Sequence, residues 1–140
     1  MTSDQLLEQL KRHEGKRLKP YHCTEGKLTI GYGRNLDDVG ISDSEASFML
    51  RNDISKAYVD LIQNHPWVDD LNIARREVLI NMVFNMGISR FNKFIKTLAA
   101  VRAGDYEEAA KEMLSSRWAD QVGDRANELA RQMVTGEYNA

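Results

Sequence analysis

The stretch HEGKRLKPYHCTEGKLTIGYGRNL, residues 13–36, decides the fold because a helical pattern ends in it and a strand pattern begins. Before it, three leucines share one helical face, and Gly15 is a typical helix stop. After Pro20 the run KLTIGYG alternates as a β-strand does. We therefore expect two or three short antiparallel strands between about residue 18 and residue 41.

Nearly all of the remaining chain has helical patterning. Apolar residues recur at helical spacing over residues 43–63, which predicts one long helix capped by Ser42 or Ser44 and followed by Pro66. REVLINMVFNMG, residues 76–87, is apolar on almost every side, as expected of a buried central helix. Shorter helices follow, separated by glycines.

These patterns predict an α+β fold. It would be predominantly helical and two-lobed, with a small N-terminal antiparallel sheet, a long connecting helix and a helical C-terminal lobe. We assign the sheet-containing lobe to residues 13–45, the connecting helix to 46–64, and the helical lobe to 65–140 together with 1–12. A single domain of 140 residues can bury a core without disulfides or metals.

The composition excludes several classes of protein. At 42% hydrophobic and 29% charged residues the chain is typical of a soluble globular protein, and its net charge of −2 argues against a nucleic-acid partner. No run is long and apolar enough for a membrane anchor, and the N-terminus does not resemble a signal peptide. The three histidines are scattered, so we expect no metal and no cofactor.

Five basic residues lie close together in this sequence: Lys11, Arg12, Lys16, Arg17 and Lys19. They could form an ordinary solvated face of the protein. They could instead attract an anionic polymer.

Glu14 is the first candidate for chemistry. It stands at the end of the first predicted helix, where the negative end of the helix dipole disfavours an ionised carboxylate. A protonated carboxyl is what a general acid requires. An exposed glutamate at a helix end is the plainer interpretation.

Thr29 and Gly31 mark a second candidate region. If residues 27–33 form a strand, Thr29, Gly31 and Gly33 point to one face of it, and Leu28, Ile30 and Tyr32 point to the other. Glycine in a strand often marks close approach of a ligand or of another backbone segment. That face could be the floor of a cleft, or it could simply face solvent.

Cys23 is the only cysteine. A free cysteine is most often a small buried hydrophobic residue. Its thiolate could also act as a base, a nucleophile or a stabiliser of charge, and His22 and the nearby basic residues could favour ionisation.

Glu14, Cys23 and Thr29 are separated by eight and then five residues within EGKRLKPYHCTEGKLTIGYG. This arrangement resembles the signature of the phage-type lysozymes, endolysins of glycoside hydrolase family 24, in which an acid, an Asp or Cys and a Thr stand at the same spacing. LINMVFNMG at 79–87 and SRWADQVGDRA at 116–126 are similar to two further blocks of that family, in the same order. Together the three blocks cover most of the chain.

The resemblance implies a muramidase, which hydrolyses the β-1,4 bond between N-acetylmuramic acid and N-acetylglucosamine in peptidoglycan. Glu14 would be the general acid, Thr29 would hold the attacking water, and Cys23 would take the place usually given to Asp. Aspartate, with a pKa of about 3.9, is ionised at neutral pH, whereas a free cysteine, with a pKa of about 8.5, mostly is not. Cys23 could support the water or the developing positive charge as a thiolate. By the same resemblance Arg125 would pair with the catalytic glutamate, and the other cleft residues would be Glu25, Asn81, Phe84 and Asn85.

The resemblance further implies a bacteriolytic monomer that acts on bacterial peptidoglycan. It would stay in the host bacterial cytoplasm until a separate holin releases it to the cell wall. Two other functions remain open at this point. A non-catalytic peptidoglycan-binding module would keep the cleft, and a helical interaction or nucleic-acid-binding protein would explain the basic residues near Glu14.

Overall fold

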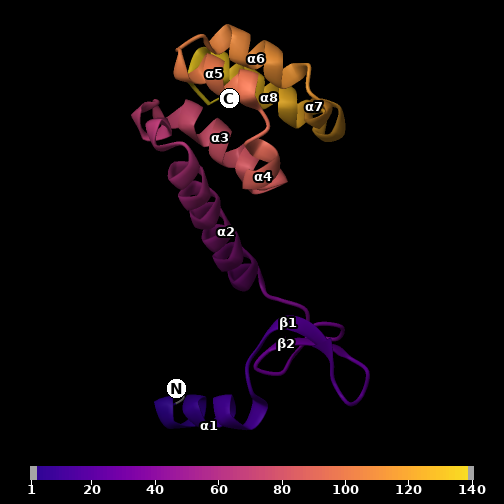
Figure 1. Ribbon diagram of the computed structural model, residues 1–140. Coiled ribbons are helices and arrows are strands. Elements are labelled where there is room, and N and C mark those ends of the chain that lie inside the picture. Colours follow the sequence, from indigo (N-terminus) through magenta and orange to yellow (C-terminus); the bar gives the residue numbers. More distant parts are fainter. Residues whose placement is uncertain (1–2, 139–140) are drawn as a thin grey trace. The chain divides into compact units, whose positions relative to one another are not determined.

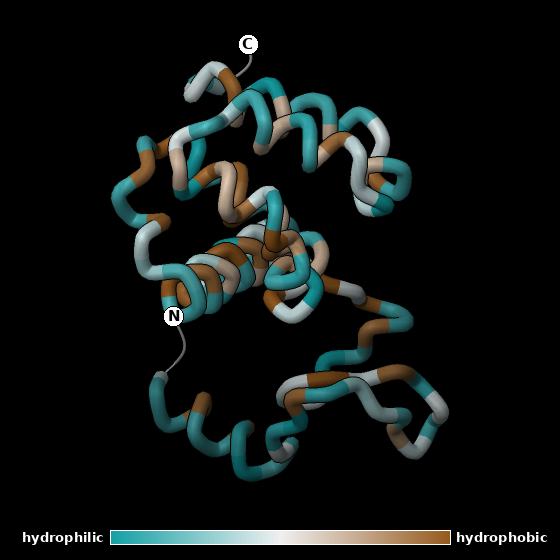
Figure 2. The backbone as a smooth tube through the Cα atoms, turned by 45° about the horizontal axis from the view of Figure 1, so that its top comes forward, coloured by the Kyte–Doolittle hydropathy of each residue, from teal (hydrophilic) through white to brown (hydrophobic). Residues whose placement is uncertain are grey.

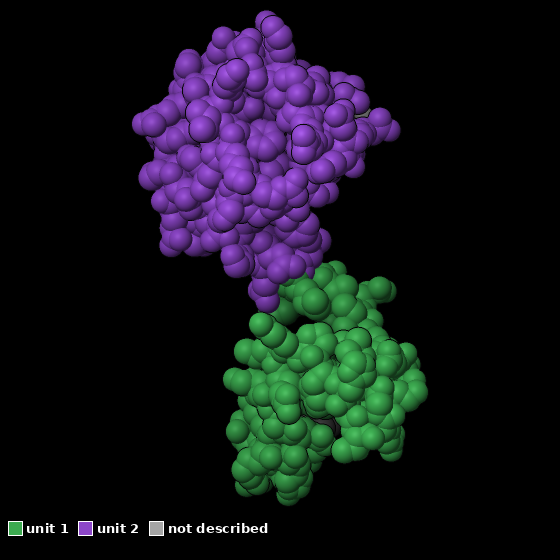
Figure 3. Space-filling view, turned by 45° about the vertical axis from the view of Figure 1, so that its right-hand side comes forward, with its two compact units in different colours: residues 1–49 green, residues 50–140 purple. Residues whose placement is uncertain are grey.

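The computed structural model describes residues 3–138. They form two compact units whose boundary lies between Met49 and Leu50 (Figure 3). The predicted α+β class is confirmed, because helices dominate and a small antiparallel sheet lies near the N-terminus (Figure 1). The assignment of residues 1–12 to the helical lobe stays a prediction.

The first unit begins with helix α1 (Asp4–Glu14), which Ser3 caps by accepting a hydrogen bond from the backbone of Leu6 at 3.2 Å. Gly15 ends the helix, as predicted. Three strands follow in the order β1-β2-β3, namely β1 (Arg17–His22), β2 (Leu28–Gly31) and β3 (Arg34–Asn35). Both strand pairs are antiparallel, in agreement with the sequence pattern.

Helix α2 (Asp43–Asn64) is the predicted long helix, and the unit boundary falls within it. Ser42 Oγ accepts from the backbone N–H of Glu45 at 3.2 Å, and Glu45 Oε1 accepts from the backbone N–H of Ser42 at 2.9 Å. This reciprocal pair is a capping box, so Ser42 is the cap rather than Ser44. Pro66 opens the 3-10 helix η1 (Pro66–Asp70) directly after α2.

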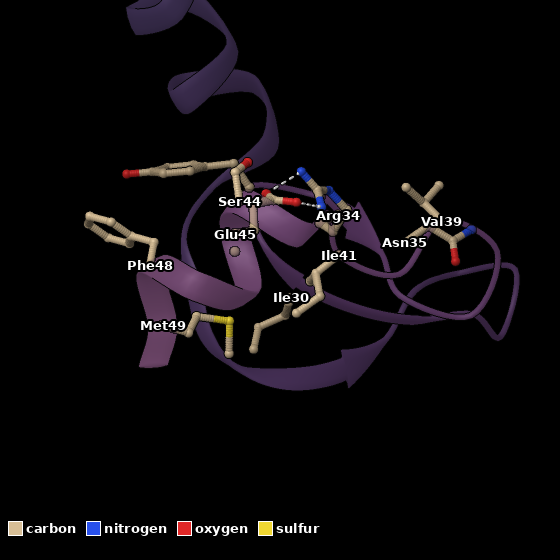
Figure 4. A pocket seen from close by; sticks show the side chains of 12 residues that line it. Ile30, Arg34, Asn35, Val39, Ile41, Ser44, Glu45, Phe48 and Met49 are labelled. Carbon is tan, nitrogen blue, oxygen red and sulfur yellow. Dashed lines mark hydrogen bonds and ion pairs between the residues drawn. The ribbon is translucent and has the colours of Figure 1, made fainter. Parts of the chain in front are cut away.

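A bidentate ion pair joins the sheet to the start of α2. Arg34 donates from Nη1 to Glu45 Oε1 at 2.8 Å and from Nη2 to Oε2 at 2.7 Å (Figure 4). Arg34 Nη1 also donates to the carbonyl oxygen of Gly40 at 3.1 Å. The guanidinium of Arg34 and the backbone N–H of Ser42 lower the pKa of Glu45 to about 2.

The second unit contains the hydrophobic core. Its helices after η1 are α3 (Ile73–Met86), α4 (Ile88–Phe91), α5 (Ile95–Arg102), α6 (Tyr106–Leu114), α7 (Arg117–Val122) and α8 (Asp124–Thr135) (Figure 1). Helix α3 supplies five buried residues, which confirms it as the predicted buried helix: Ala74, Val78, Leu79, Met82 and Val83. The largest fully buried side chain of the core is Phe91, from α4.

Polar contacts tie the start of α3 to the C-terminal end of the chain. Asn72 caps α3 by accepting from the backbone of Arg75 at 3.0 Å, and it donates from Nδ2 to the carbonyl oxygen of Gly136 at 2.8 Å. Arg75 donates to the carbonyl oxygens of Met133 and Val134 at 2.8 and 2.9 Å. Its guanidinium also lies 3.7 Å from the ring centroid of Tyr106.

The first unit has very little buried surface of its own. Among its described residues only Thr29 is buried. Helix α1 is largely hydrophilic in Figure 2, and its three leucines, at 6, 7 and 10, are 40–52% exposed. The described part of this unit therefore has no buried apolar core of its own.

We predict that Glu45→Gln lowers the melting temperature at neutral pH and that the difference from wild type shrinks in acid. The pKa of Glu45 is depressed on folding, so the stability it contributes is present above its ordinary value of 4.5 and is lost as the pH falls toward about 2. Thermal unfolding across this range measures the effect. Glu8→Gln, at an exposed site in the same unit, is the control, and a gap that stays constant with pH would contradict the prediction.

Candidate functional site

The three residues of the sequence signature lie in the first unit. Glu14 is the last residue of α1, Cys23 follows the end of β1, and Thr29 is the second residue of β2. In the antiparallel register Thr29 is opposite Tyr21, two residues before Cys23. The hairpin therefore brings Cys23 and Thr29 together, although five residues separate them in the chain.

Glu14 lies directly against Gly33. A Cβ atom added to Gly33 would be only 2.7 Å from Glu14 Oε2 and 3.3 Å from Glu14 Cδ. Gly33 also has a φ of +77°, a conformation that side chains other than glycine rarely adopt. Glycine at this position therefore serves two purposes, since it turns the chain and it leaves room for the carboxylate.

The predicted floor of Thr29, Gly31 and Gly33 is only partly correct. Strand β2 ends at Gly31, and Tyr32 and Gly33 form the turn into β3. The positive φ of Gly31, +71°, interrupts the strict alternation. An added Cβ at Gly31 would meet no atom within 4 Å, so its role is conformational, and only Gly33 shows the predicted close approach.

Cys23 stands at the first position of a tight turn. Its backbone N–H donates to the carbonyl oxygen of Lys27 at 2.9 Å, and its own carbonyl accepts from the N–H of Gly26 at 2.8 Å. The backbone N–H groups of Lys27 and Glu25, followed by the Thr29 hydroxyl, lower the pKa of the Cys23 thiol. Partial burial and the charge of Glu25 act in the opposite direction.

The expected source of this activation was different. His22 and the neighbouring lysines and arginines are not among the causes of the lowered pKa. Hydrogen-bond donors fixed by the turn and by Thr29 stabilise the thiolate instead. Sequence alone could not show this, because it does not say where backbone N–H groups point.

Thr29 is only 4% exposed, so it does not lie on a solvent-facing strand surface. Its hydroxyl donates to the carbonyl oxygen of Lys27 at 2.9 Å, and it is also one of the groups that lower the pKa of Cys23. A hydroxyl carries one proton, so Thr29 donates either to that carbonyl or to the sulfur. Ionisation of Cys23 favours the second arrangement.

The remaining predicted residue of the first unit is Glu25. It is exposed and lies in the turn directly after Cys23 and Thr24. Its carboxylate raises the pKa of Cys23, and its backbone N–H lowers it. The backbone and the side chain of Glu25 therefore shift the pKa of the thiol in opposite directions.

Four predicted residues lie in the second unit: Asn81, Phe84, Asn85 and Arg125. Arg125 donates from Nε and Nη2 to Asn81 Oδ1 at 3.0 and 2.7 Å. Asn85 Oδ1 instead accepts from Trp118 Nε1 at 2.9 Å. The pairing of Arg125 with Glu14 stays a prediction.

A groove of about 270 Å³ in the second unit is lined by three of these residues, Asn81, Phe84 and Arg125. Tyr138 lines the same groove, and its hydroxyl forms a short hydrogen bond with Glu77. The sequence interpretation missed both Tyr138 and Glu77. Their separation of 61 residues leaves no local pattern that could have indicated the contact.

A larger pocket of about 960 Å³ lies in the first unit (Figure 4). The Arg34–Glu45 ion pair forms part of its lining, together with the apolar side chains of Ile30, Ile41 and Met49. The turn at Gly33, which touches Glu14, belongs to the same lining. Arg34 and Glu45 were also missed, although the Ser42-x-x-Glu45 pattern is a recognisable capping box.

The described residues contain no group of three or more His, Cys, Asp or Glu side chains placed to hold a metal ion. None of the described helices has the length and apolar character needed to cross a membrane. The signature residues of the first unit supply a carboxyl group, a thiol and a hydroxyl. These groups can transfer a proton and hold a water molecule.

Comparison with known proteins shows the family of this chain. The profile of the phage lysozyme family matches residues 11–133. The chain belongs to the phage lysozyme family. It is a lysozyme-type enzyme, and peptidoglycan is the substrate that its family implies.

Individual relatives cover most of this lysozyme. It is 31% identical to probable T4-type lysozyme 1 of Dictyostelium discoideum, with 96% of each chain covered. It is 34% identical to an endolysin of Acyrthosiphon pisum secondary endosymbiont phage 1, covering 84% of this chain and 79% of that protein. It is also 31% identical to the pre-baseplate central spike protein Gp5 of Enterobacteria phage T4, of which it covers only 28%.

We predict that Gly33→Ala impairs the lysozyme by displacing Glu14. The new methyl group would meet Glu14 Oε2, and a small displacement of a reacting group can reduce kcat/KM by about 100-fold. Kinetics on purified peptidoglycan measure the loss. Gly104→Ala is the matched control, because Gly104 has a φ of +79° and open space around it.

Both glycine variants should lose about 1–2 kcal/mol of stability, since both force alanine into a left-handed conformation. Only Gly33→Ala should also show the large loss in kcat/KM. If the two variants are equally destabilised and have the same kcat/KM, the contact between Gly33 and Glu14 does not affect activity.

We further predict that Thr29→Val raises the pKa of Cys23. The substitution keeps the shape of the side chain but removes the hydroxyl that supports the thiolate. The rate of alkylation by iodoacetamide, followed against pH, reports the fraction of thiolate. Thr24→Val, at an exposed position beside Cys23, is the control and should leave the profile unchanged. An unchanged profile for Thr29→Val would remove Thr29 from the environment of the sulfur.

Proposed function

We propose that this lysozyme hydrolyses the β-1,4 bond between N-acetylmuramic acid and N-acetylglucosamine in bacterial peptidoglycan. In this proposal Glu14 is the general acid that protonates the leaving oxygen. Thr29 holds the attacking water on the opposite side of the sugar. Cys23 stabilises that water or the positive charge that develops on the sugar, as a thiolate.

The pairing of β1 with β2, which brings Cys23 near Thr29, is the observation that carries the proposal. The Thr29 hydroxyl is also among the groups that lower the pKa of Cys23, which supports a water molecule shared by the two side chains. Cys23 is half-buried, whereas Thr29 is buried, with 4% exposure. The lowered pKa of Cys23 increases the fraction of thiolate, which carries the negative charge that aspartate usually supplies in this family.

The acid is supported by a separate contact. Glu14 lies against the turn at Gly33, which Arg34 and Glu45 connect to the first turn of α2. Such a support restricts the positions that the carboxyl group can take. Glycosidases gain rate from this kind of fixed placement of the proton donor.

The remaining proposed cleft residues are Glu25, Gly31, Asn81, Phe84, Asn85 and Arg125. Asn81 and Arg125 already hold each other, so they would present one fixed polar group to a sugar. We also propose that the enzyme acts as a monomer and serves host-cell lysis. It would remain in the host cytoplasm until a holin admits it to the wall.

The decisive comparison is wild type against Glu14→Gln on purified peptidoglycan. Loss of the general acid should reduce kcat by about 100-fold or more, because a positioned proton donor contributes about 100- to 10,000-fold. New reducing ends and loss of turbidity measure the hydrolysis. Glu8→Gln, on the same helix, is the matched control and should remain active.

Two other results would change the conclusion. If Glu14→Gln keeps full activity, another group donates the proton and the assignment of Glu14 is wrong. If wild type binds peptidoglycan but releases no reducing ends, the chain is a wall-binding module with a lysozyme fold.

A further inference from the structure

Five basic residues at the end of α1 and the start of β1 form a cationic surface that the proposed reaction does not use. We call Lys11, Arg12, Lys16, Arg17 and Lys19 the 11–19 cations. All but the half-buried Lys11 are exposed. Figure 1 shows that β1 follows α1 after a short connection, so the two segments are close in the same unit.

Acidic side chains leave this surface largely unneutralised. Within the part of the chain that the structure describes, Lys11 alone among the 11–19 cations forms an ion pair, with Glu8 at 3.5 Å. Arg17 instead lies over the ring of Tyr21, with its guanidinium carbon 4.6 Å from the ring centroid. Its charge is therefore still available to an external anion.

The other cations of the same unit are different. Lys27 pairs with Asp38 at 3.2 Å, and Arg34 pairs with Glu45 at 2.7 Å. Both basic residues of the segment from Lys27 to Glu45 are thus paired with an acid, whereas only one of the five 11–19 cations is. The whole chain has a net charge of −2, so the positive region is a local feature rather than a result of a basic protein.

The helix dipole explains only part of the cluster. Basic residues are favoured in the last turn of a helix, which accounts for Lys11 and Arg12. Lys16, Arg17 and Lys19 follow the helix end at Gly15 and do not belong to the last turn of α1. These three are the residues for which a ligand is the best explanation.

We propose that the 11–19 cations bind the free carboxylates of the peptides attached to the muramic acid units of peptidoglycan. The inference rests on the proposed function, because it takes Glu14 as the residue at the scissile bond. Lys16 and Arg17 follow Glu14 by two and three residues, so these cations lie on the segment that carries the proposed acid. Each muramic acid carries its peptide on the sugar ring whose bond is cut, which brings carboxylates to this position.

Chemistry favours carboxylates at this surface. Arginine presents paired N–H donors that match a carboxylate, and lysine adds a compact positive charge. Each exposed contact is weak, so several must act together, and added salt must weaken them. The surface would therefore lower KM for glycan strands that carry peptides, and it would leave bare glycan strands unaffected.

The test uses a variant with Lys16→Gln, Arg17→Gln and Lys19→Gln. Its control removes the same charge from the second unit by Lys93→Gln, Lys96→Gln and Lys111→Gln, all at exposed positions. The substrates are intact peptidoglycan and glycan strands from which an amidase has removed the peptides. KM and kcat are measured at ionic strengths of about 0.01 M and about 0.1 M, where charges act over about 30 Å and about 10 Å.

The first variant should raise KM for intact peptidoglycan roughly threefold to tenfold at low ionic strength. The effect should shrink at the higher ionic strength. KM for the stripped strands and kcat on both substrates should stay near the wild-type values. The control variant should match wild type throughout, and circular dichroism melts establish that all the proteins are folded.

Equal changes of KM on both substrates, or no change, would overturn the proposal. Competition by polyphosphate or duplex DNA is a further arm of the experiment. If the first variant loses affinity for these polymers and not for intact peptidoglycan, the surface belongs to a phosphate-bearing partner. Sedimentation with intact and stripped peptidoglycan measures binding even if wild type hydrolyses neither, which separates this inference from a failure of the proposed function.

Discussion

The ion pair between Arg34 and Glu45 is the interaction that joins the sheet of the first unit to helix α2. The described part of that unit buries a single residue, Thr29, so the hydrophobic effect contributes little there. Two parallel hydrogen bonds between guanidinium and carboxylate fix the end of the sheet to the start of α2. The turn at Gly33 directly precedes Arg34, so the same pair also fixes the surface that Glu14 touches.

The second unit is stabilised by a different principle. Helix α3 is surrounded by apolar side chains from the helices that follow it, and large residues such as Phe91 and Met133 are almost completely buried. Burial of this kind stabilises a fold without requiring particular polar partners. The candidate acid, thiol and hydroxyl all lie in the first unit, where polar contacts rather than a buried core are prominent. Small changes of charge or of hydrogen bonding can therefore alter these groups without disrupting the main core.

The sequence predicted the elements well because their signals are local. The helical spacing of residues 43–63 led to α2, and the apolar run of residues 76–87 led to the buried α3. The alternation around Thr29 identified a strand but placed Gly33 in it, since alternation does not show where a positive φ turns the chain. The signature spacing identified Cys23 and Thr29, and the hairpin register explains why they meet.

Other parts of the site could not be read in the same way. The donors that stabilise the Cys23 thiolate are backbone groups, which every residue possesses, so composition gave a misleading explanation based on nearby charges. The contact between Tyr138 and Glu77 joins residues far apart in the chain and has no periodic pattern. Arg34 and Glu45 are common residue types, and only the structure shows that they form an ion pair.

The cap of α3 has a consequence for how the chain is made. Asn72 holds the start of that helix with its oxygen and holds the carbonyl of Gly136 with its nitrogen. A ribosome synthesises residue 72 before residue 136, so this connection cannot close until residue 136 has been made. While the ribosome is still adding residues 73–135, the start of α3 lacks this hydrogen bond.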